Sequence, residues 1–399
     1  MAYLKMTREE WNKTIDDYIM EEQLKVGKPV VASIDVHNSW PQAHKLVTEE
    51  VIKDFAWNLG DNNPLFTDTA YAAQTRWGGV IAPPGSFLRY IAETGSFALG
   101  RSIPGVNHLY GGTTFNYYDV VRADDSFKIH DDYLGVIEKP LKGKHYRLLI
   151  MTCKRSYINR EDRIICEALG NTVITCMYPG DVKEGKSSAV YTEKKRQRYS
   201  RELLDAIHEH YEDDLTGKFR RGSKVLYWED VNEEEELKTL IKGPIDIVDI
   251  ISFLCGTGAQ LGGASTKWAT MKNLLKLKDP ETGEWMPIET FHYRSDIAHQ
   301  LGIPGALVYG AQNEAYLSQL VTNWMGDDGF VEKMIHQHRE PCFHGDIIYV
   351  KGNVARKYIE NDEHLVEINM WTENQDGVKI CPSTAVVRLL SKEQVYEIK

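Results

Sequence analysis

The sequence predicts an α+β protein built from two similar halves, each a curved antiparallel sheet wrapped round one buried helix. Two observations support this fold class. Within each half the hydrophobic spacing changes from a helical period to strict alternation, and the order of helices, glycine turn and strands occurs twice along the chain. A sheet that curves round a helix buries one face of every strand without parallel crossovers.

Length and charge limit the class of protein. The chain has 399 residues, more than one ordinary hydrophobic core needs, and this predicts two domains. A formal net charge of -11 argues against nucleic acids and anionic membranes as partners. The sequence has no apolar run that could span a membrane and no cysteine or histidine spacing typical of a metal site. We expect a cytoplasmic protein without a metal, with six buried, reduced cysteines.

The first half begins with helices. Residues 6–26 have apolar side chains at helical spacing, and Thr7 followed by Glu10 predicts a capping box at the start. Residues 48–60 again show one apolar face and end on a glycine, a common helix stop. Residues 87–99 follow two prolines and are apolar enough to form the buried helix.

The period then changes to that of strands. β-Branched and aromatic residues alternate with polar ones in four segments, 113–121, 127–137, 145–158 and 171–177. Residues 183–222 are strongly polar and predict a crossover with one exposed helix. We therefore place an N-terminal domain at 1–182, a linker at 183–222 and a C-terminal domain at 223–399.

The same order returns after the linker, which indicates an internal duplication. Residues 231–256 and 292–321, separated by a polar insertion, repeat the order of helix, glycine turn and buried helix, and strands are predicted at 345–359, 363–373 and 383–390. Spacing is kept between the halves over about fifty residues. The alignment pairs Phe66 with His292, Pro84 with Gly310, and Asp124 with Asp346.

The stretch GDNNPLFTD, residues 60–68, and the segments YWEDVNEEEEL, GPIDIVDIISF and LVTNWMGDDGF together carry a family resemblance. The chain resembles the MaoC-like, double hot-dog acyl dehydratases, in particular the branch whose first half is called a fungal-fatty-acid-synthase-like dehydratase domain. The resemblance implies two tandem hot-dog units acting on acyl-CoA thioesters. It also implies the usual activity, that of an (R)-specific enoyl-CoA hydratase or 3-hydroxyacyl dehydratase.

The family motif, G-D-x-N-P-[IL]-H, is divided between the halves. In the first half Asp61 and Asn63 match it, but Phe66 stands where the motif has histidine. In the second half His292 matches the histidine, and Pro287 stands five residues earlier in place of the acid. Each half therefore retains one member of the pair that the resemblance assigns to catalysis.

Hydration of an unsaturated thioester needs a base, an acid and hydrogen-bond donors for the enolate-like oxygen. Backbone amides at the start of a buried helix suit the third role. In the first half that start is at Pro84, which has no amide hydrogen, whereas the second half offers Tyr309 and Gly310. This difference favours the second half as the reacting site, with His292 as its imidazole.

The carboxylate partner of His292 stays open at this stage. Glu289 is close in sequence, and Asp296 would share a face with His292 if the segment is helical. The insertion before them, residues 261–290, could instead supply Glu281 or Glu284. The alternative is that His292 is structural and bonds to the inserted loop.

The first-half motif has a structural reading of its own. Asp61 and Asn63 lie in good turn chemistry, so a role in the turn competes with catalysis. Phe66 is expected to line or fill an acyl tunnel, where its burial is worth roughly 2 kcal/mol. A composite site that joins Asp61 to His292 is the less favoured arrangement. The histidines at 336, 338 and 344 are interpreted as a solvated edge rather than a metal site.

These residues favour a cytoplasmic enoyl-CoA hydratase or 3-hydroxyacyl-CoA dehydratase that has no cofactor of its own and forms a homodimer or higher homo-oligomer. Two other functions stay open. Because both motifs are incomplete, the chain could be a catalytically silent acyl-CoA-binding or scaffold subunit. Hot-dog proteins also hydrolyse acyl-CoA, and a carboxylate that activates water would suffice for a thioesterase.

Overall fold

The structure is a computed structural model of the whole chain. It describes residues 6–28, 46–91, 103, 106–141, 146–178, 194–257, 276–301 and 303–393. Its helices are α1 (Arg8–Gln23), α3 (Glu49–Leu59), α4 (Pro64–Thr67), α5 (Thr69–Ala72), α6 (Ser86–Ile91), α8 (Arg201–Leu215), α9 (Ile247–Gly256), α11 (Ser295–Gln300) and α12 (Gly310–Met325), with 3-10 turns η2 (Trp228–Asp230) and η3 (Ile288–His292).

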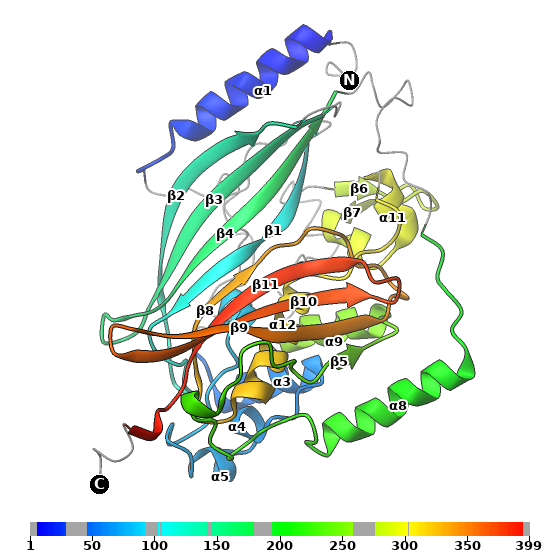
Figure 1. Cartoon of the computed structure of the whole chain (residues 1–399). Coiled ribbons are helices and arrows are strands. Elements are labelled where there is room, and N and C mark those ends of the chain that lie inside the picture. The colour runs from blue at the N-terminus through cyan, green and yellow to red at the C-terminus, as the bar shows by residue number, and fades with distance from the viewer. Residues whose placement is uncertain are drawn as a thin grey trace.

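The strands join both halves into one antiparallel sheet. The first half contributes β1 (Val106–Tyr117), β2 (Lys128–Lys139), β3 (Tyr146–Ile158) and β4 (Ile164–Met177). The second contributes β5 (Leu240–Lys242), β8 (Phe330–His336), β9 (Ile348–Glu360), β10 (Glu363–Asn374) and β11 (Lys379–Arg388). The order is β2-β3-β4-β1-β8-β11-β10-β9-β5, so β1 and β8 form the seam between the halves (Figure 1). A separate hairpin consists of β6 (Lys276–Lys278) and β7 (Trp285–Pro287).

Helix α12 is the central helix of the second half. Every residue from Ala311 to Met325 is buried, and the helix contacts β1, β9, β10 and β11 as well as α6. It nevertheless carries many polar side chains, namely Gln312, Asn313, Glu314, Ser318, Gln319, Thr322 and Asn323. Buried polar groups cost free energy unless they are bonded, so polarity on such a helix marks a site to explain.

Helix α1 covers a separate core at the far end of the first half. Trp11, Ile15 and Tyr18 pack there against side chains from β2, β3 and β4, and Figure 1 shows α1 alongside these strands. The predicted capping box is confirmed, because the Thr7 side chain accepts from the Glu10 amide and Glu10 bonds back to Thr7. The predicted helix at 48–60 is also confirmed as α3, which ends on Gly60 with a φ of 72°.

Equivalent hydrogen bonds show that the halves repeat one another. The Ala82 amide donates to Val121 over 2.8 Å, and the Val308 amide donates to Cys342 over 2.9 Å. The short helices beside them agree as well. In α5 the Ala72 amide, and in α11 the Ala298 amide, each donates to the carbonyl of the residue four positions earlier. The predicted pairing of Phe66 with His292 follows this register, 226 residues apart.

One predicted correspondence was wrong by a residue. Asp346 accepts from the Phe343 amide over 3.0 Å, and the same bond in the first half runs from Arg122 to Asp125 over 2.7 Å. Asp125 is therefore the counterpart of Asp346, and Asp124 is not. Between the start of the buried helix and this carboxylate the second half has five fewer residues than the first, so the offset between the halves changes from 226 to 221 residues.

The offset of 221 residues continues into the strands at the seam. The amide of Tyr118 donates to Ile165 over 2.9 Å, and the amide of Arg339 donates to Ile380 over 3.0 Å. The residues just before these donors, Tyr117 and His338, therefore occupy equivalent places. On the helices the earlier register makes Glu314 the counterpart of Leu88.

Several other expectations have a structural outcome. Five cysteines are buried as expected, but Cys255 is exposed on α9, because it lies on the outer side of that helix. The predicted helix at 87–99 is described only as far as Ile91, and its remainder lies outside the described residues. Helix α8, within the predicted crossover, buries only Ile207. The described residues include no helix long and apolar enough to cross a membrane.

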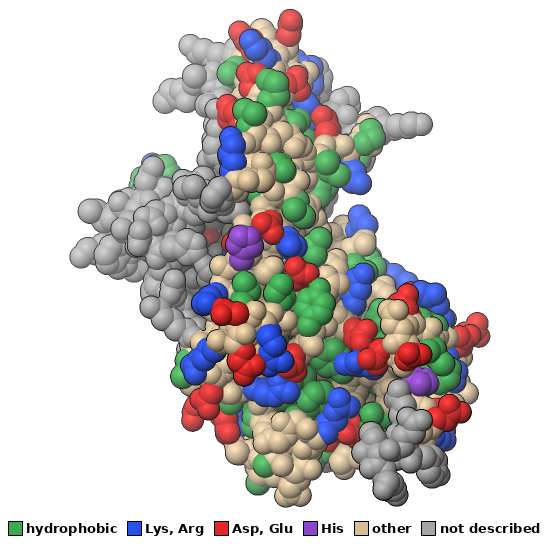
Figure 2. All heavy atoms as spheres, turned by 90° about the vertical axis from the view of Figure 1, so that its left-hand side faces the viewer, with side chains coloured by type: hydrophobic (Ala, Val, Ile, Leu, Met, Phe, Trp, Pro, Cys, Tyr) green, Lys and Arg blue, Asp and Glu red, His purple; other side chains and the backbone are tan. Residues whose placement is uncertain are grey.

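Charges are mixed on the surface. In the face shown in Figure 2, lysine and arginine side chains alternate with aspartate and glutamate, and no field of one sign covers it. In the described part of the chain no group of three or more metal-ligating side chains converges.

Candidate functional site

The first-half motif lines a narrow apolar cleft between α4, the start of α6 and the end of α12. Asn63 and Phe66 form one wall, and Leu88 and Tyr117 belong to its lining. Phe66 is 1% exposed, so its ring packs in the core beside the cleft as expected for a wall. The Asn63 side chain accepts from the Leu65 amide over 3.1 Å and caps α4. Asn63 thus has a structural task in addition to its place in the cleft.

Helix α6 in the first half starts with its donor already bonded. The Gly85 amide donates to the hydroxyl of Tyr117 over 2.6 Å, and the residue before it is Pro84, which has no amide hydrogen. The position at which an oxyanion would bind is therefore taken by a protein oxygen. This arrangement supports the expectation that the first half is not the reacting half.

Asp61 is buried at the end of α3. One carboxylate oxygen accepts from the Asn63 amide over 3.0 Å, and the ammonium of Lys242 lies 3.4 Å from the carbonyl oxygens of Leu59 and Gly60. Burial raises the pKa of Asp61 to about 6, although the Asn63 amide and Lys242 oppose it. These contacts hold a turn together.

The raised pKa of Asp61 predicts a pH effect on stability. Such a carboxyl stabilises the fold below its unfolded pKa of 3.8, and this contribution is lost as pH rises through about 6. We expect the unfolding free energy of Asp61→Asn, relative to wild type, to rise by about 1–2 kcal/mol between about pH 5 and pH 8. Urea unfolding at both pH values measures it, and an unchanged difference would show that Asp61 is ionised in the fold.

His292 ends the 3-10 turn η3 and packs against α12. Its Nδ1 lies 2.8 Å from the carbonyl oxygen of Leu307. A carbonyl only accepts, so Nδ1 carries the hydrogen and Nε2 is left with the lone pair. The imidazole stacks on the ring of Tyr309 at 3.7 Å between centroids, and burial lowers the pKa of His292 to about 3. The ring is therefore neutral at physiological pH.

The start of α12 differs from the start of α6. Tyr309 is the N-cap but offers no side-chain cap, and its hydroxyl lies 3.1 Å from that of Tyr293. Within the described residues, no acceptor lies on the amides of Gly310 and Ala311. Helix-start amides without an acceptor favour negative charge. The second half therefore has the donor site that Tyr117 fills in the first.

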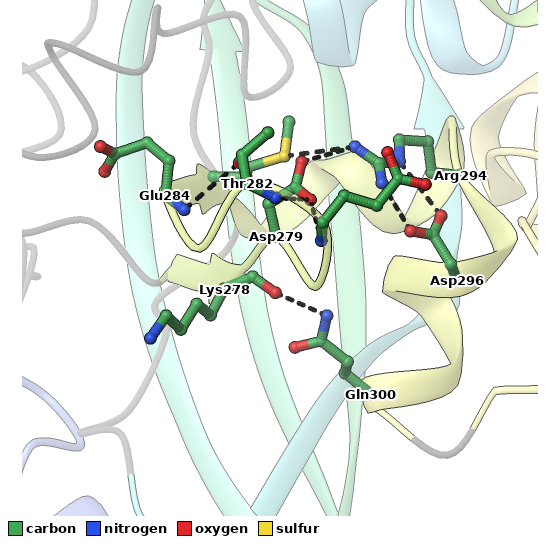
Figure 3. A network of polar contacts seen from close by, with 9 residues as sticks. Lys278, Asp279, Thr282, Glu284, Arg294, Asp296 and Gln300 are labelled. Atoms are coloured by element: carbon green, nitrogen blue, oxygen red, sulfur yellow. Dashed lines mark hydrogen bonds and ion pairs between the residues drawn. The ribbon is translucent and has the colours of Figure 1, made fainter.

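The two proposed carboxylate partners of His292 lie in different surroundings. Glu289 is in the same 3-10 turn, and burial raises its pKa. Asp296 is exposed and forms an ion pair with Arg294 at 2.5 Å, as Figure 3 shows. The condition that would place Asp296 on the face of His292, one continuous helix, is not met, because η3 ends at His292 and α11 begins at Ser295.

The acids of the insertion lie on the β6–β7 hairpin. Glu284 is exposed and accepts from the Trp285 amide over 2.7 Å, and the Glu281 amide donates to Asp279 over 2.8 Å. Asp279 in turn binds Arg294, so the hairpin is connected to the surface network of Figure 3. These contacts give Glu281 and Glu284 a place in the turn.

A buried polar cluster beside Gly310 was not predicted. Glu314 is fully buried and accepts from the Tyr110 hydroxyl over 2.5 Å, while His338 Nε2 lies 3.2 Å from the same oxygen. A side chain added at Gly310 would lie 2.9 Å from His338 Nε2. The sequence interpretation of His338 as part of a solvated edge was wrong, because the strand that precedes it carries it under the start of α12.

The register of the duplication explains this cluster. Phe66, Leu88 and Tyr117 line the first-half cleft. Their counterparts in the second half are His292, Glu314 and His338, each of which can ionise. The second half therefore has polar side chains at positions where aromatic and aliphatic ones line the first-half cleft. The sequence signal was present in the duplication but required the change of offset after the buried helix.

Comparisons with known proteins agree with this architecture. Residues 37–168 match the family described as a FAS1-like dehydratase domain region. A solved structure described as a MaoC-like dehydratase aligns with a TM-score of 0.58 at 15% identity, over 88% of this chain and 98% of that one. A putative MaoC domain protein dehydratase from Chloroflexus aurantiacus aligns with a TM-score of 0.50 at 11% identity, over 88% of this chain and 95% of that one.

No curated protein matches the chain. At such identities the solved structures establish the fold, and both cover nearly the whole chain. The family match includes the GDNNPLFTD stretch that suggested the resemblance. The predicted hot-dog fold and the resemblance to MaoC-like dehydratases are therefore confirmed.

Proposed function

We propose that this chain, which has the fold of MaoC-like dehydratases, adds water reversibly to an α,β-unsaturated acyl thioester in its second half. The observation that carries the proposal is the pairing of a neutral imidazole, His292, with the helix-start amides of α12, on which the described residues place no acceptor. The first half has lost both features. It lacks the histidine at Phe66, and Tyr117 occupies the amide of Gly85.

His292 is the proposed base. Water gives a proton to Nε2 of His292, its oxygen bonds to the β-carbon, and the thioester oxygen gains enolate character. The amides of Gly310 and Ala311 stabilise that oxygen. Glu289 is the proposed partner of His292. Glu289 lies in the same 3-10 turn as His292, and burial raises the pKa of its carboxyl.

The remaining elements of the proposal concern the substrate and its surroundings. Coenzyme A is the expected carrier, and no resident cofactor is needed because the thioester itself activates the double bond. Asn63 and Phe66 shape the first-half cleft, which suits an apolar acyl chain. We propose a cytoplasmic homo-oligomer as the working form.

A substrate panel tests the function. Purified protein is incubated with enoyl-CoA thioesters of increasing chain length and branching, and loss of the enoyl absorbance is followed together with release of free CoA. Hydration consumes the enoyl band without releasing CoA. Release of CoA would instead indicate a thioesterase, and the absence of turnover on every substrate would favour a silent binding subunit.

A further inference from the structure

We propose that the cavity between the crossover and the start of α9 binds a phosphorylated ligand through its phosphate groups, with Arg196, Arg198 and Arg201 as the binding side chains. The cavity has a volume of about 600 Å³, which lies in the usual range of small-molecule sites. None of its lining residues belongs to the first-half cleft or takes part in the proposed hydration.

The crossover segment 194–200 is fixed on the second half at both ends, and Figure 1 shows it as the green trace that leads into α8. The Lys194 ammonium lies 3.1 Å from the buried carboxylate of Asp346. Five residues later, the Tyr199 hydroxyl donates to the carbonyl of Gly345 over 2.7 Å. The two arginines between these contacts are therefore held at the cavity before a ligand arrives, which lowers the entropy cost of binding.

Gly345 allows the crossover to lie close to the loop before β9. Its φ is 92°, and an added methyl group would lie 3.2 Å from Cγ of Arg196. In the first half the equivalent residue is Asp124, which has a similar φ of 70° but carries a side chain. The glycine therefore stands in the half where an arginine packs on this turn.

The cavity is cationic although the protein has a net charge of -11. Arg196 forms an ion pair with Asp246 at 2.8 Å, and Arg201 forms one with Asp205 at 2.8 Å, while the described residues give Arg198 no carboxylate partner. Three arginines and one aspartate line the cavity, which leaves a charge of +2. A phosphate monoester carries about two negative charges at neutral pH and matches this charge. A single carboxylate would leave one positive charge uncompensated.

The guanidinium groups are available to a ligand. The side chains of Arg196 and Arg201 are 56% and 76% exposed, and ion pairs at such exposure contribute little to stability. Arginine suits phosphate because its planar fork donates two parallel hydrogen bonds. Helix α8 begins at Arg201, so its dipole also favours an anion at this place.

The phosphate can belong to the carrier of a thioester or to a free phosphorylated molecule. Gly345 lines the cavity, and the amide of the preceding His344 donates to the carbonyl of Ala306 over 3.1 Å. The next carbonyl, that of Leu307, bonds His292. The cavity thus lies close to the proposed reacting histidine, which makes a carrier one source. Both sources present the same chemistry to the arginines.

Isothermal titration calorimetry of the full chain with coenzyme A and with ADP measures this binding without turnover. Pantetheine serves as the probe without phosphate. We expect phosphorylated probes to bind and Arg198→Gln to weaken their binding by about 10–100-fold, the usual effect of losing hydrogen bonds to a charged group. A higher affinity for coenzyme A than for ADP would identify a carrier as the source, and an equal or higher affinity for ADP would identify a free phosphorylated molecule.

Arg163→Gln is the matched control, because it removes an exposed arginine of the first half that lies outside the cavity. It should leave the affinity unchanged, and both variants should unfold like wild type. The inference is overturned if neither phosphorylated probe binds, if pantetheine binds as tightly, or if Arg198→Gln leaves the affinity unchanged. None of these results bears on hydration, which the panel of enoyl thioesters tests separately.

Discussion

Replacing His292 by glutamine is expected to lower kcat/KM for hydration by about 10²–10⁴-fold, the usual contribution of a general base. Glutamine approximates the size of the ring but cannot accept a proton. It can still donate to the carbonyl of Leu307, so the fold should be kept. Steady-state rates on the best enoyl thioester of the panel measure the effect.

Phe66→Leu is the matched control for His292→Gln. Phe66 is the counterpart of His292 in the first half and lines an apolar cleft. We expect this variant to change the preferred acyl chain and to lose about 1 kcal/mol of stability, with hydration of short substrates retained. Full activity in His292→Gln would contradict the site assignment. Loss of hydration in a folded Phe66→Leu variant would place the reaction in the first half.

The pKa of His292 adds a second readout. A group whose pKa is lowered in the fold contributes stability above its unfolded pKa of 6.5, and that stability is lost as pH falls towards about 3. Wild type should therefore lose stability on acidification through this range more steeply than His292→Gln. Equal slopes in urea unfolding would contradict the burial of a neutral ring.

The second large effect is expected at the seam between the halves. Gly112 sits in β1 with a φ of 116°, and an added methyl group would collide with the carbonyl oxygen of His336 in β8. Gly112→Ala should cost about 3 kcal/mol or more, because the strain and the clash both act on backbone that cannot move cheaply. Denaturant unfolding measures the loss.

Gly79→Ala is the matched control, since nothing lies within 4 Å of the position of its added methyl group. Its expected change is within about 0.5 kcal/mol. The seam also places Tyr110 on Glu314, so Gly112→Ala should disturb this buried hydrogen bond as well as lower stability. A Gly112→Ala variant as stable as wild type would show that β1 and β8 are not joined as described.

Local patterns were enough to predict much of the fold. The cap at Thr7, the stop at Gly60 and the alternation in β3 and β4 depend on nearby residues, and all are present in the structure. The duplication could also be inferred from the sequence. The number of residues from Phe66 to the start of the following buried helix equals, within two, the number from His292 to the start of its own.

The cluster of Glu314 and His338 was not predicted, because finding it requires following the duplication through its change of offset. These residues lie 24 positions apart and meet only because β8 returns beneath α12. Their correspondence to Leu88 and Tyr117 depends on two different offsets, and a single alignment hides it. The pairing of Asp296 with His292 required one continuous helix, but the helical turn ends at His292 and α11 begins only at Ser295.

The most direct test of the central claim is a crystal structure with a stable enoyl-thioester analogue. We predict the thioester oxygen within hydrogen-bond distance of the Gly310 and Ala311 amides, with its β-carbon facing Nε2 of His292. An analogue whose thioester lies in the first-half cleft, against Phe66 and Tyr117, would contradict the account.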